Sequence, residues 1–273
     1  MGSCSLRHYG PVVSRLKWGI STSLSAELSE PVAVAELAVS AEAAGWDGFF
    51  VWDHLWNRTG EPFADPWVTL AAVAVATDQI AIGTLVTPLP RRRPQVLAQQ
   101  AATLDRLADG RLILGLGLGH DGYGEYSTFD EPRDTARSRA QALDAGIDFL
   151  VQALTGAVVE SAGRRTTIPT RRRPRFPIWV AGRTGVGAGP RRARRHELEG
   201  VAIVGESVWS PAHVTDVLER GEFAPGETDV VLTGGEHPSP DRLAAAGATW
   251  AIPELMPGTT RTEALQQIQQ APY

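Results

Sequence analysis

An aspartate and a histidine, Asp53 and His54, stand next to each other in the short tryptophan-bracketed stretch Trp52–Trp56. Histidine takes up and releases protons near neutral pH, and a carboxylate beside it can hold the imidazole in one orientation. The pair therefore predicts acid–base chemistry at this point of the chain. The same two residues would also suit a structural pair whose hydrogen bonds order the loop that follows.

A second cluster is the glycine-rich stretch Gly115–Gly122, which contains Gly117, Gly119 and His120. Glycine has no Cβ, so such a stretch lets a flat ligand approach the backbone closely. It is not the dinucleotide fingerprint of Rossmann folds, because the expected helix does not open at its glycines. His120 could be a second acid–base group or a solvated loop residue, and the glycines could serve turn geometry alone.

A third cluster begins with Gly182, Arg183, Thr184 and Gly185 and leads into a predicted helix at Arg191–His196. Free backbone N–H groups and the positive end of a helix dipole bind phosphate, and an arginine adds a bidentate partner. We therefore predict a phosphate cradle in this loop. The alternative is a mobile loop followed by a solvated arginine face.

Two further arginine runs lie at Arg91–Arg93 and Arg171–Arg173. The first follows a predicted strand and could face an anionic ligand, although most such runs are simply solvated. Lys17 is the sole lysine among 26 basic residues, so a compositional bias toward arginine could explain these runs without function.

The candidate site residues above must be positioned by the secondary structure around them. The sequence contains eight apolar, strand-like runs, each followed by a segment of helix length. The predicted strands are Leu16–Ser21, Gly48–Trp52, Ile80–Thr84, Leu112–Leu116, Ile178–Ala181, Val201–Val204, Val230–Leu232 and Thr249–Ile252. The predicted helices are Pro31–Ala44, Pro66–Ala76, Pro94–Ala108, Ala136–Leu154, Arg191–His196, Ala212–Arg220, Arg242–Ala246 and Thr262–Gln269, with an inserted hairpin of Val158–Glu160 and Thr166–Ile168 before the fifth strand. This alternation predicts an α/β fold, a single (β/α)₈ barrel whose active groups follow the strands. A doubly wound open sheet, which usually has fewer strands, is the alternative.

Length and composition are those of an ordinary globular protein. The 273 residues suit one barrel domain, and the net charge of −5 provides no basic field for nucleic acid or a membrane surface. Cys4 is the single cysteine, which excludes an internal disulfide and favours the reducing cytoplasm. We expect residues 1–15 to be a disordered lead-in, because they lack the features of a signal peptide.

Three segments of the chain together resemble the luciferase-like monooxygenase family. They are AAGWDGFFVWDH (Ala43–His54), the long stretch Asp65–Gly119 and PIWVAG (Pro177–Gly182), in family order and at family spacing, with weaker similarity at GATWAIPE near the C-terminus. The resemblance covers most of the chain and implies one luciferase-like barrel domain over residues 16–270. A long insertion of the luciferases proper is largely missing, so bioluminescence is not expected.

The resemblance also implies a cofactor, either FMN or the deazaflavin F420, at the carboxyl ends of the strands. In similar enzymes the ring lies against a bulge with a non-proline cis peptide after the third strand, which corresponds to Thr84, Leu85 and Val86 here. The phosphate commonly sits after the fifth strand, at Gly182–Gly185. Gly117 and Gly119 complete the expected cofactor site.

In F420-dependent relatives an Asp–His pair lies near the reactive ring carbon, and Asp53 and His54 match it. Some sugar-phosphate dehydrogenases of that group carry a glutamate where this chain has His120, which puts their acid–base assignment and substrate in doubt here. The resemblance thus favours hydride transfer between reduced F420 and a small organic substrate, with His54, held by Asp53, handling the proton. Relatives are often dimers, so a homodimer is expected.

Three other functions remain as alternatives. FMN would permit monooxygenation with molecular oxygen, and a barrel that lost turnover would be a catalytically silent flavin-binding protein. A metal-dependent barrel hydrolase would need several convergent ligands, for which Asp53, His54 and Glu254 are the candidates. We therefore expect no metal site, and no nucleic-acid or membrane partner.

Overall fold

The computed structural model describes residues 15–56, 60–133, 135–156, 158–161, 164–168 and 175–270. All but one residue of the expected disordered lead-in 1–15, and the whole run Arg171–Arg173, lie outside the described residues. Within them, no helix is both long enough and apolar enough to cross a membrane.

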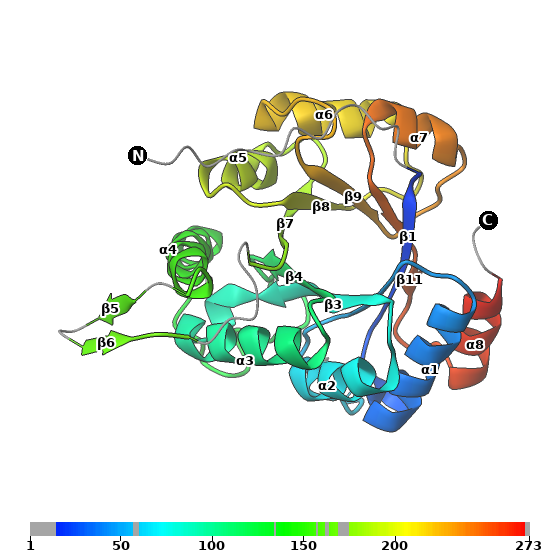
Figure 1. Cartoon of the computed structure of the whole chain (residues 1–273), viewed down its shortest axis with the longest axis horizontal. Helices are drawn as coiled ribbons and strands as arrows, with labels where there is room; N and C mark the ends of the chain where they lie inside the picture. The colour runs from blue at the N-terminus through cyan, green and yellow to red at the C-terminus, as the bar shows by residue number, and fades with distance from the viewer. Residues whose placement is uncertain are drawn as a thin grey trace.

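A closed barrel of parallel strands forms the centre of the molecule (Figure 1). Its strands, in barrel order, are β1 (Lys17–Thr22), β2 (Gly48–Val51), β3 (Ala81–Pro88), β4 (Leu112–Gly117), β7 (Ile178–Arg183), β8 (Gly200–Val204), β9 (Asp229–Thr233) and β10 (Trp250–Ile252), and β10 pairs with β1 to close the ring. A short strand, β11 (Glu254–Leu255), continues β10 along β1. The prediction of a (β/α)₈ barrel is therefore confirmed, and an open doubly wound sheet is excluded.

The helices lie outside this ring (Figure 1). They are α1 (Pro31–Ala43), α2 (Pro66–Ala76), α3 (Pro94–Leu107), α4 (Ala136–Leu154), α5 (Ala188–Arg195), α6 (Pro211–Gly221), α7 (Pro240–Ala246) and α8 (Arg261–Gln269), with short 3₁₀ turns η1 (Ala26–Ser29) and η2 (Leu89–Arg91). The start of α2 shows why local sequence predicts these elements well. The Asp65 carboxylate accepts the N–H groups of Trp67 and Val68 at 2.9 Å each, and Pro66 occupies the first turn, where no donor is needed.

Several boundaries differ from the predicted ones, as at α5, which begins at Ala188 and not at Arg191, and the differences at β3 and at the inserted hairpin are described here. β3 runs four residues further than predicted, to Pro88, because a bulge lets the strand resume its pairing with β4. The inserted hairpin pairs β5 (Val159–Ser161) with β6 (Arg164–Thr166), closer together in sequence than predicted.

Aromatic side chains fill the interior of the barrel, from the end formed by the amino ends of the strands (the lower end) up to its middle. Phe50 packs 5.6 Å from Trp179 and 5.9 Å from Trp250 between ring centroids. At the lower end the Trp179 indole donates to Asp229 at 3.1 Å, and the Lys17 ammonium lies 5.1 Å from the centroid of Trp250. The bottom of the barrel is therefore closed, and any ligand must enter at the carboxyl ends of the strands.

Candidate active site

β3 carries a bulge near the carboxyl end of the barrel. Its register with β4 shifts between Thr84 and Thr87, and the peptide bond between Leu85 and Val86 is cis. This confirms the bulge and the cis bond that the family resemblance implied. Thr84 is fully buried, and its hydroxyl donates to the carbonyl of Gly115 at 3.1 Å, so it serves the sheet. Val86 is half-exposed at the mouth and packs on the interior cluster.

The glycines predicted to face a ligand after β4 are positions of close packing. A Cβ on Gly117 would lie 2.4 Å from Cγ2 of Val86, and one on Gly119 would lie 2.6 Å from the hydroxyl of Tyr126. Gly119 also has a φ of +66°, which favours glycine. Both glycines make room for neighbouring side chains, so Val86 is the group that a ligand would meet at Gly117.

Asp53 is a buried anchor for two arginines. Its side chain is 0% exposed, and its oxygens accept Nε and a terminal nitrogen of Arg92 at 2.7 and 2.8 Å. Arg91 donates to the Asp53 carbonyl at 2.6 Å and lies 3.6 Å from its carboxylate. The hypothesis that Asp53 holds His54 is wrong, because a carboxylate between two guanidinium groups is fully engaged with them.

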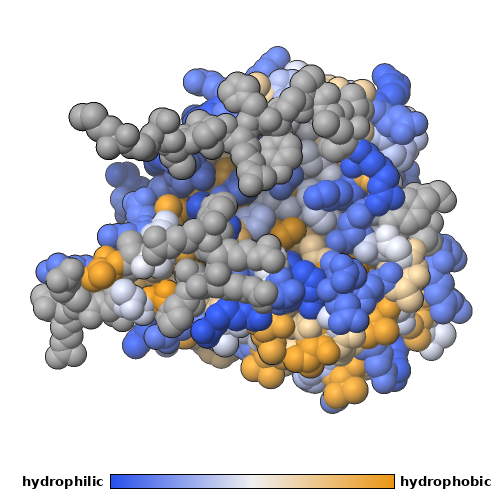
Figure 2. Space-filling model, in the orientation of Figure 1, coloured by the Kyte–Doolittle hydropathy of each residue, from blue (hydrophilic) through white to orange (hydrophobic). Residues whose placement is uncertain are grey.

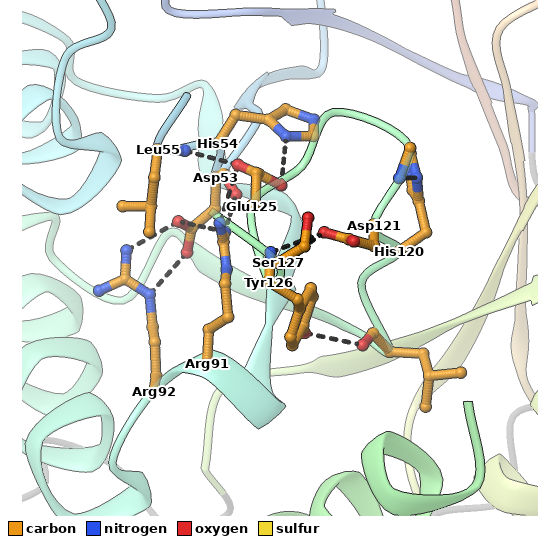
Figure 3. Close-up of polar contacts among 12 residues, drawn as sticks. Asp53, His54, Leu55, Arg91, Arg92, His120, Asp121, Glu125, Tyr126 and Ser127 are labelled. Carbon is orange, nitrogen blue, oxygen red and sulfur yellow. Dashed lines mark hydrogen bonds and ion pairs between the residues drawn. The ribbon is translucent and has the colours of Figure 1, made fainter. Parts of the chain in front are cut away.

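Glu125 is the carboxylate that holds His54 (Figure 3). Nδ1 of His54 lies 3.1 Å from Oε2 of Glu125, while the other oxygen accepts the N–H of Leu55 at 2.7 Å. One carboxylate thus fixes both the ring of His54 and the backbone that follows it. Because Nδ1 is engaged in this contact, Nε2 is the nitrogen through which His54 can act on a ligand.

Arg91 joins the two carboxylates into one buried network, as Figure 3 shows. Its side chain is 2% exposed and forms ion pairs with Asp53 and with Glu125, the latter at 2.8 Å. Burial alone would raise the pKa of Glu125. The pKa of Glu125 is nevertheless lowered, because other contacts outweigh burial: the hydrogen bond and charge of His54, the charge of Arg91 and the N–H of Leu55. Glu125 therefore stays ionised beside the imidazole.

The loop after β4 is built to present Glu125. The Asp121 carboxylate accepts the N–H groups of Tyr126 and Ser127 at 2.8 and 3.1 Å, which folds the chain back on itself around Glu125. These bonds lower the pKa of Asp121. The Tyr126 hydroxyl donates to the Leu118 carbonyl at 3.2 Å, and burial raises the pKa of Tyr126 to about 12, so it stays a hydrogen-bond donor.

Aromatic rings surround His54 on three sides. Its ring centroid lies 6.0 Å from Trp52, 6.3 Å from Phe63 and 5.2 Å from Tyr123, each in an edge-on arrangement. The imidazole side chain is 22% exposed. The site thus combines a proton-exchanging group with a largely apolar surround, which suits a flat organic ligand.

His120 lies beyond Tyr123, whose ring centroid is 5.4 Å from it. Its Nδ1 accepts the N–H of Gly122 at 2.9 Å. Burial, followed by the charge of His54, lowers the pKa of His120. It is therefore a mainly neutral imidazole at neutral pH, and the ring of Tyr123 packs near both histidines.

The loop predicted as a phosphate cradle contains carboxylates as well as donors. The Gly185 N–H donates to Asp216 at 3.2 Å, and the Thr184 hydroxyl donates to Glu206. Gly185 has a φ of +67° and open space around it, and Arg183 beside it is exposed. An incoming phosphate would have to replace these carboxylates as the acceptors of the loop.

The arginine runs near the site are mostly engaged in ion pairs. Arg91 and Arg92 bind the buried carboxylates described above and so do not face a ligand, whereas Arg93 of the same run is exposed. On α5, Arg192 binds Asp144 at 2.5 Å and Arg194 binds Glu227 at 2.5 Å.

Three residues that bind Asp53 or His54 were not among the predicted site residues: Glu125, Arg91 and Arg92. Glu125 lies 71 positions from His54, so no local pattern links them. Its position in the loop after the fourth strand, where barrels carry their active groups, was the available signal. Among the described residues, no group of three or more His, Cys, Asp or Glu side chains could hold a metal ion.

Comparison with known proteins places this geometry in a family. The sequence pattern of the luciferase-like monooxygenase family matches residues 14–201. An F420-dependent glucose-6-phosphate dehydrogenase from Nakamurella multipartita is 32% identical over 208 residues, which cover 71% of this chain and 58% of that protein. The chain therefore spans little more than half the length of this relative.

Solved structures share the fold at low sequence identity. An F420-dependent secondary alcohol dehydrogenase in complex with an F420-acetone adduct is 15% identical, with a TM-score of 0.70 and coverage of 94% of this chain and 98% of that one. The oxygenating constituent of 3,6-diketocamphane monooxygenase from Pseudomonas putida, in complex with FMN, is 16% identical, with a TM-score of 0.62 over 81% of this chain and 67% of that one. Because the family pattern covers more than half of the chain and the barrel agrees with it, the chain belongs to the luciferase-like monooxygenase family.

Proposed function

We propose that this protein is an F420-dependent oxidoreductase that transfers a hydride between the cofactor and a small organic substrate. The observation that carries the proposal is the geometry of His54. Glu125 holds its Nδ1, aromatic rings surround it, and it lies on the barrel rim beside the β3 bulge. The name of the 32% identical relative, an F420-dependent dehydrogenase, supports the same cofactor.

The residues of the mouth fit a deazaflavin ring. Val86 and Trp52 are half-exposed at the rim, whereas the interior below them is buried and apolar. Leu85 and Val86 would form the apolar wall for the ring, and the loop Gly182–Gly185 with Arg183 would hold the phosphate. When bound, F420 supplies hydride chemistry in two-electron steps. The chain itself would contribute orientation and proton exchange.

His54 would exchange the proton that accompanies hydride transfer. Its Nε2 would receive a proton from a substrate hydroxyl during oxidation, or return one to a carbonyl oxygen during reduction. Ionised Glu125 would stabilise the imidazolium formed when His54 takes up the proton, as carboxylates do for catalytic histidines. Asp53, through its arginines, would position the loop without touching the reacting atoms, and His120 would contact ligand from the opposite side of Tyr123.

A binding titration tests the cofactor, and a histidine variant tests the role of His54. We expect the fluorescence of F420 to change saturably as purified protein is added, with a weaker response from FMN. We expect His54→Ala to bind F420 normally yet reduce turnover about 100-fold. His196→Ala, on the outer layer beside α5, is the matched control and should leave turnover unchanged. A response to neither cofactor would contradict the proposal.

The FMN-dependent monooxygenase is a second candidate, because a solved structure with the same fold holds FMN. It predicts the opposite outcome of the titration. FMN would bind more tightly than F420, and reduced FMN would support oxygen consumption that depends on substrate.

We also propose a homodimer in the cytoplasm, built through α2 and its neighbours. Figure 2 shows hydrophobic residues gathered along the lower edge of the molecule, where Figure 1 places α1 and α2. Val32, Val68 and Val75 are 71%, 66% and 69% exposed. α2 contains no charged residue, and a helix that is apolar all round is normally buried. A second copy of this chain is the proposed cover, because one self-complementary face suffices for a two-fold dimer.

A further inference from the structure

The inward face of the barrel continues through β10 into β11. Lys17 pairs with Trp250 and Ser21 pairs with Glu254, so the register of β1 against these strands does not slip across Pro253. Trp250 and Ile252 belong to the interior cluster. Since side chains alternate along a strand, Glu254 faces inward one layer above Ile252.

Glu254 and His54 are linked by side chains of adjacent strands. Ser21, the register partner of Glu254 on β1, accepts a hydrogen bond at 3.3 Å from the indole of Trp52, which follows β2. The Trp52 ring lies 6.0 Å from that of His54 between centroids. Glu254, Ser21, Trp52 and His54 therefore form one continuous stretch of the mouth, with a titratable group at each end.

The backbone beyond β9 leaves room for the Glu254 carboxyl group. A Cβ on Gly234 would lie 2.7 Å from Oε2 of Glu254, and Gly234 has a φ of +65°. The Gly234 carbonyl accepts the Trp209 indole at 2.7 Å, which fixes this turn. The carboxyl group thus packs against a fixed glycine turn that leaves no place for another side chain.

Glu254 has no polar partner in the part of the chain that the structure describes: no hydrogen bond or ion pair of its carboxyl group occurs there. The groups around it are uncharged: Ser21 of β1, Thr233 at the end of β9 and Gly234 just beyond β9. The charged Lys17 lies at the opposite end of β1, and His237, beyond β9, packs on the outward-facing Trp18. Burial without a partner raises the pKa of Glu254 to about 7.

We propose that Glu254 is a second proton-exchanging residue of the active site and contacts the bound cofactor or substrate. The proposal rests on the proposed function and adds a residue to that site. Reduction of a carbonyl by hydride forms a C–H bond with the electron pair and needs one proton at the oxygen. Reduced F420, when bound, would supply the hydride and would also release one proton from its ring, which a residue of the site must take up. His54 serves the proton at the substrate oxygen, Glu254 serves the proton at the ring of the cofactor, and solvent restores both groups.

Titration of the carboxyl group itself gives a readout that does not depend on turnover. In protein labelled with ¹³C at glutamate Cδ, we expect one resonance to titrate with a midpoint near pH 7 and to vanish in Glu254→Gln. Saturation with F420 should move this midpoint by at least half a pH unit. A Glu254 resonance whose midpoint is the same with and without bound F420 would overturn the proposal.

Turnover and binding of variants provide the second arm. We expect Glu254→Gln to lower turnover at least tenfold and to flatten the dependence of the F420 dissociation constant on pH between 6 and 8. Glu236→Gln, at an exposed glutamate of the loop after β9, is the matched control. Wild-type rates and an unchanged pH profile in Glu254→Gln would remove Glu254 from the mechanism and leave the proposed function standing. Failure of wild-type protein to bind F420 would instead contradict the proposed function.

Discussion

Nδ1 of His54 lies 3.1 Å from Oε2 of Glu125, and the second oxygen of that carboxylate lies 2.8 Å from Arg91. A single side chain therefore ties the candidate proton-exchanging histidine to a buried guanidinium. Removing it would affect both the reactivity of the imidazole and the stability of the loop.

Replacement of Glu125 should reduce activity and stability together. Glu125→Ala leaves Arg91 with one carboxylate fewer in a buried site, which should cost about 3 kcal/mol of unfolding free energy. It should also lower kcat by about 100-fold, because His54 loses its orienting partner. Glu125→Gln keeps a hydrogen-bond acceptor and should retain more of both. Urea denaturation and steady-state kinetics measure the two effects, and equal kinetics in the two variants would contradict the orienting role.

Replacement of Asp53 should affect stability and spare the chemical step. Asp53→Asn removes the charge that Arg91 and Arg92 share, which should cost about 3 kcal/mol of unfolding free energy. Because its carboxylate is buried away from the mouth, kcat per folded molecule should stay within threefold of wild type. A large fall in kcat at unchanged stability would return Asp53 to the catalytic residues.

The packing of Val86 against Gly117 can be tested by a double substitution. Gly117→Ala places a methyl group 2.4 Å from Cγ2 of Val86, so we expect it to destabilise the protein by about 2 kcal/mol. Adding Val86→Ala removes the clash and should recover much of that loss. Thermal unfolding of the two single variants and the double variant measures the coupling. Purely additive effects would mean that the two side chains do not meet.

Glu254 should make stability depend on pH above neutrality. The pKa of Glu254 is raised in the folded protein to about 7. Its contribution to the free energy of unfolding is therefore fully present below the pKa that Glu254 has in the unfolded chain, and this contribution is lost as the pH rises through about 7. Relative to Glu254→Gln, the wild type should lose up to about 3 kcal/mol between pH 5 and pH 9. Urea unfolding at a series of pH values gives the difference. Parallel pH curves for the two proteins would show that the carboxyl group titrates normally.

The apolar face of α2 should control oligomeric state. Val68→Glu combined with Val75→Glu places two charges on this face, and we expect the mass in solution to fall from that of a dimer to that of a monomer. Val158→Glu, near the hairpin and also exposed, is the control and should stay dimeric. Light scattering measures the mass, and a monomeric wild type would contradict the proposed interface.

Local signals in the sequence predicted the elements well. The predicted bounds of α2, Pro66–Ala76, agree with the structure, in which Asp65 and Pro66 form the start of the helix. The alternation of strands and helices predicted the barrel. β3 was predicted too short because a bulge interrupts the pattern of pairing without changing the apolar character of the strand. Element boundaries of this kind depend on the neighbouring strand.

The partners within the site could not be predicted in the same way. Asp53 and His54 are adjacent in sequence, yet each points to a partner far along the chain, Arg92 and Glu125. Adjacent residues at the end of a strand point in different directions, so neighbourhood in sequence does not imply contact. The sequence allows the run that contains Arg91 to face an anionic ligand or to be solvated, and only the fold brings two carboxylates to Arg91.

The packing of Lys17 over Trp250 at the closed end of the barrel has a practical consequence. Lys17 carries the sole lysine amine of the chain, and it lies at the opposite end of the barrel from His54. An amine-reactive surface coupled through Lys17 would therefore hold the molecules with their entrances directed toward solution, and a dye attached there would leave the ligand's path clear.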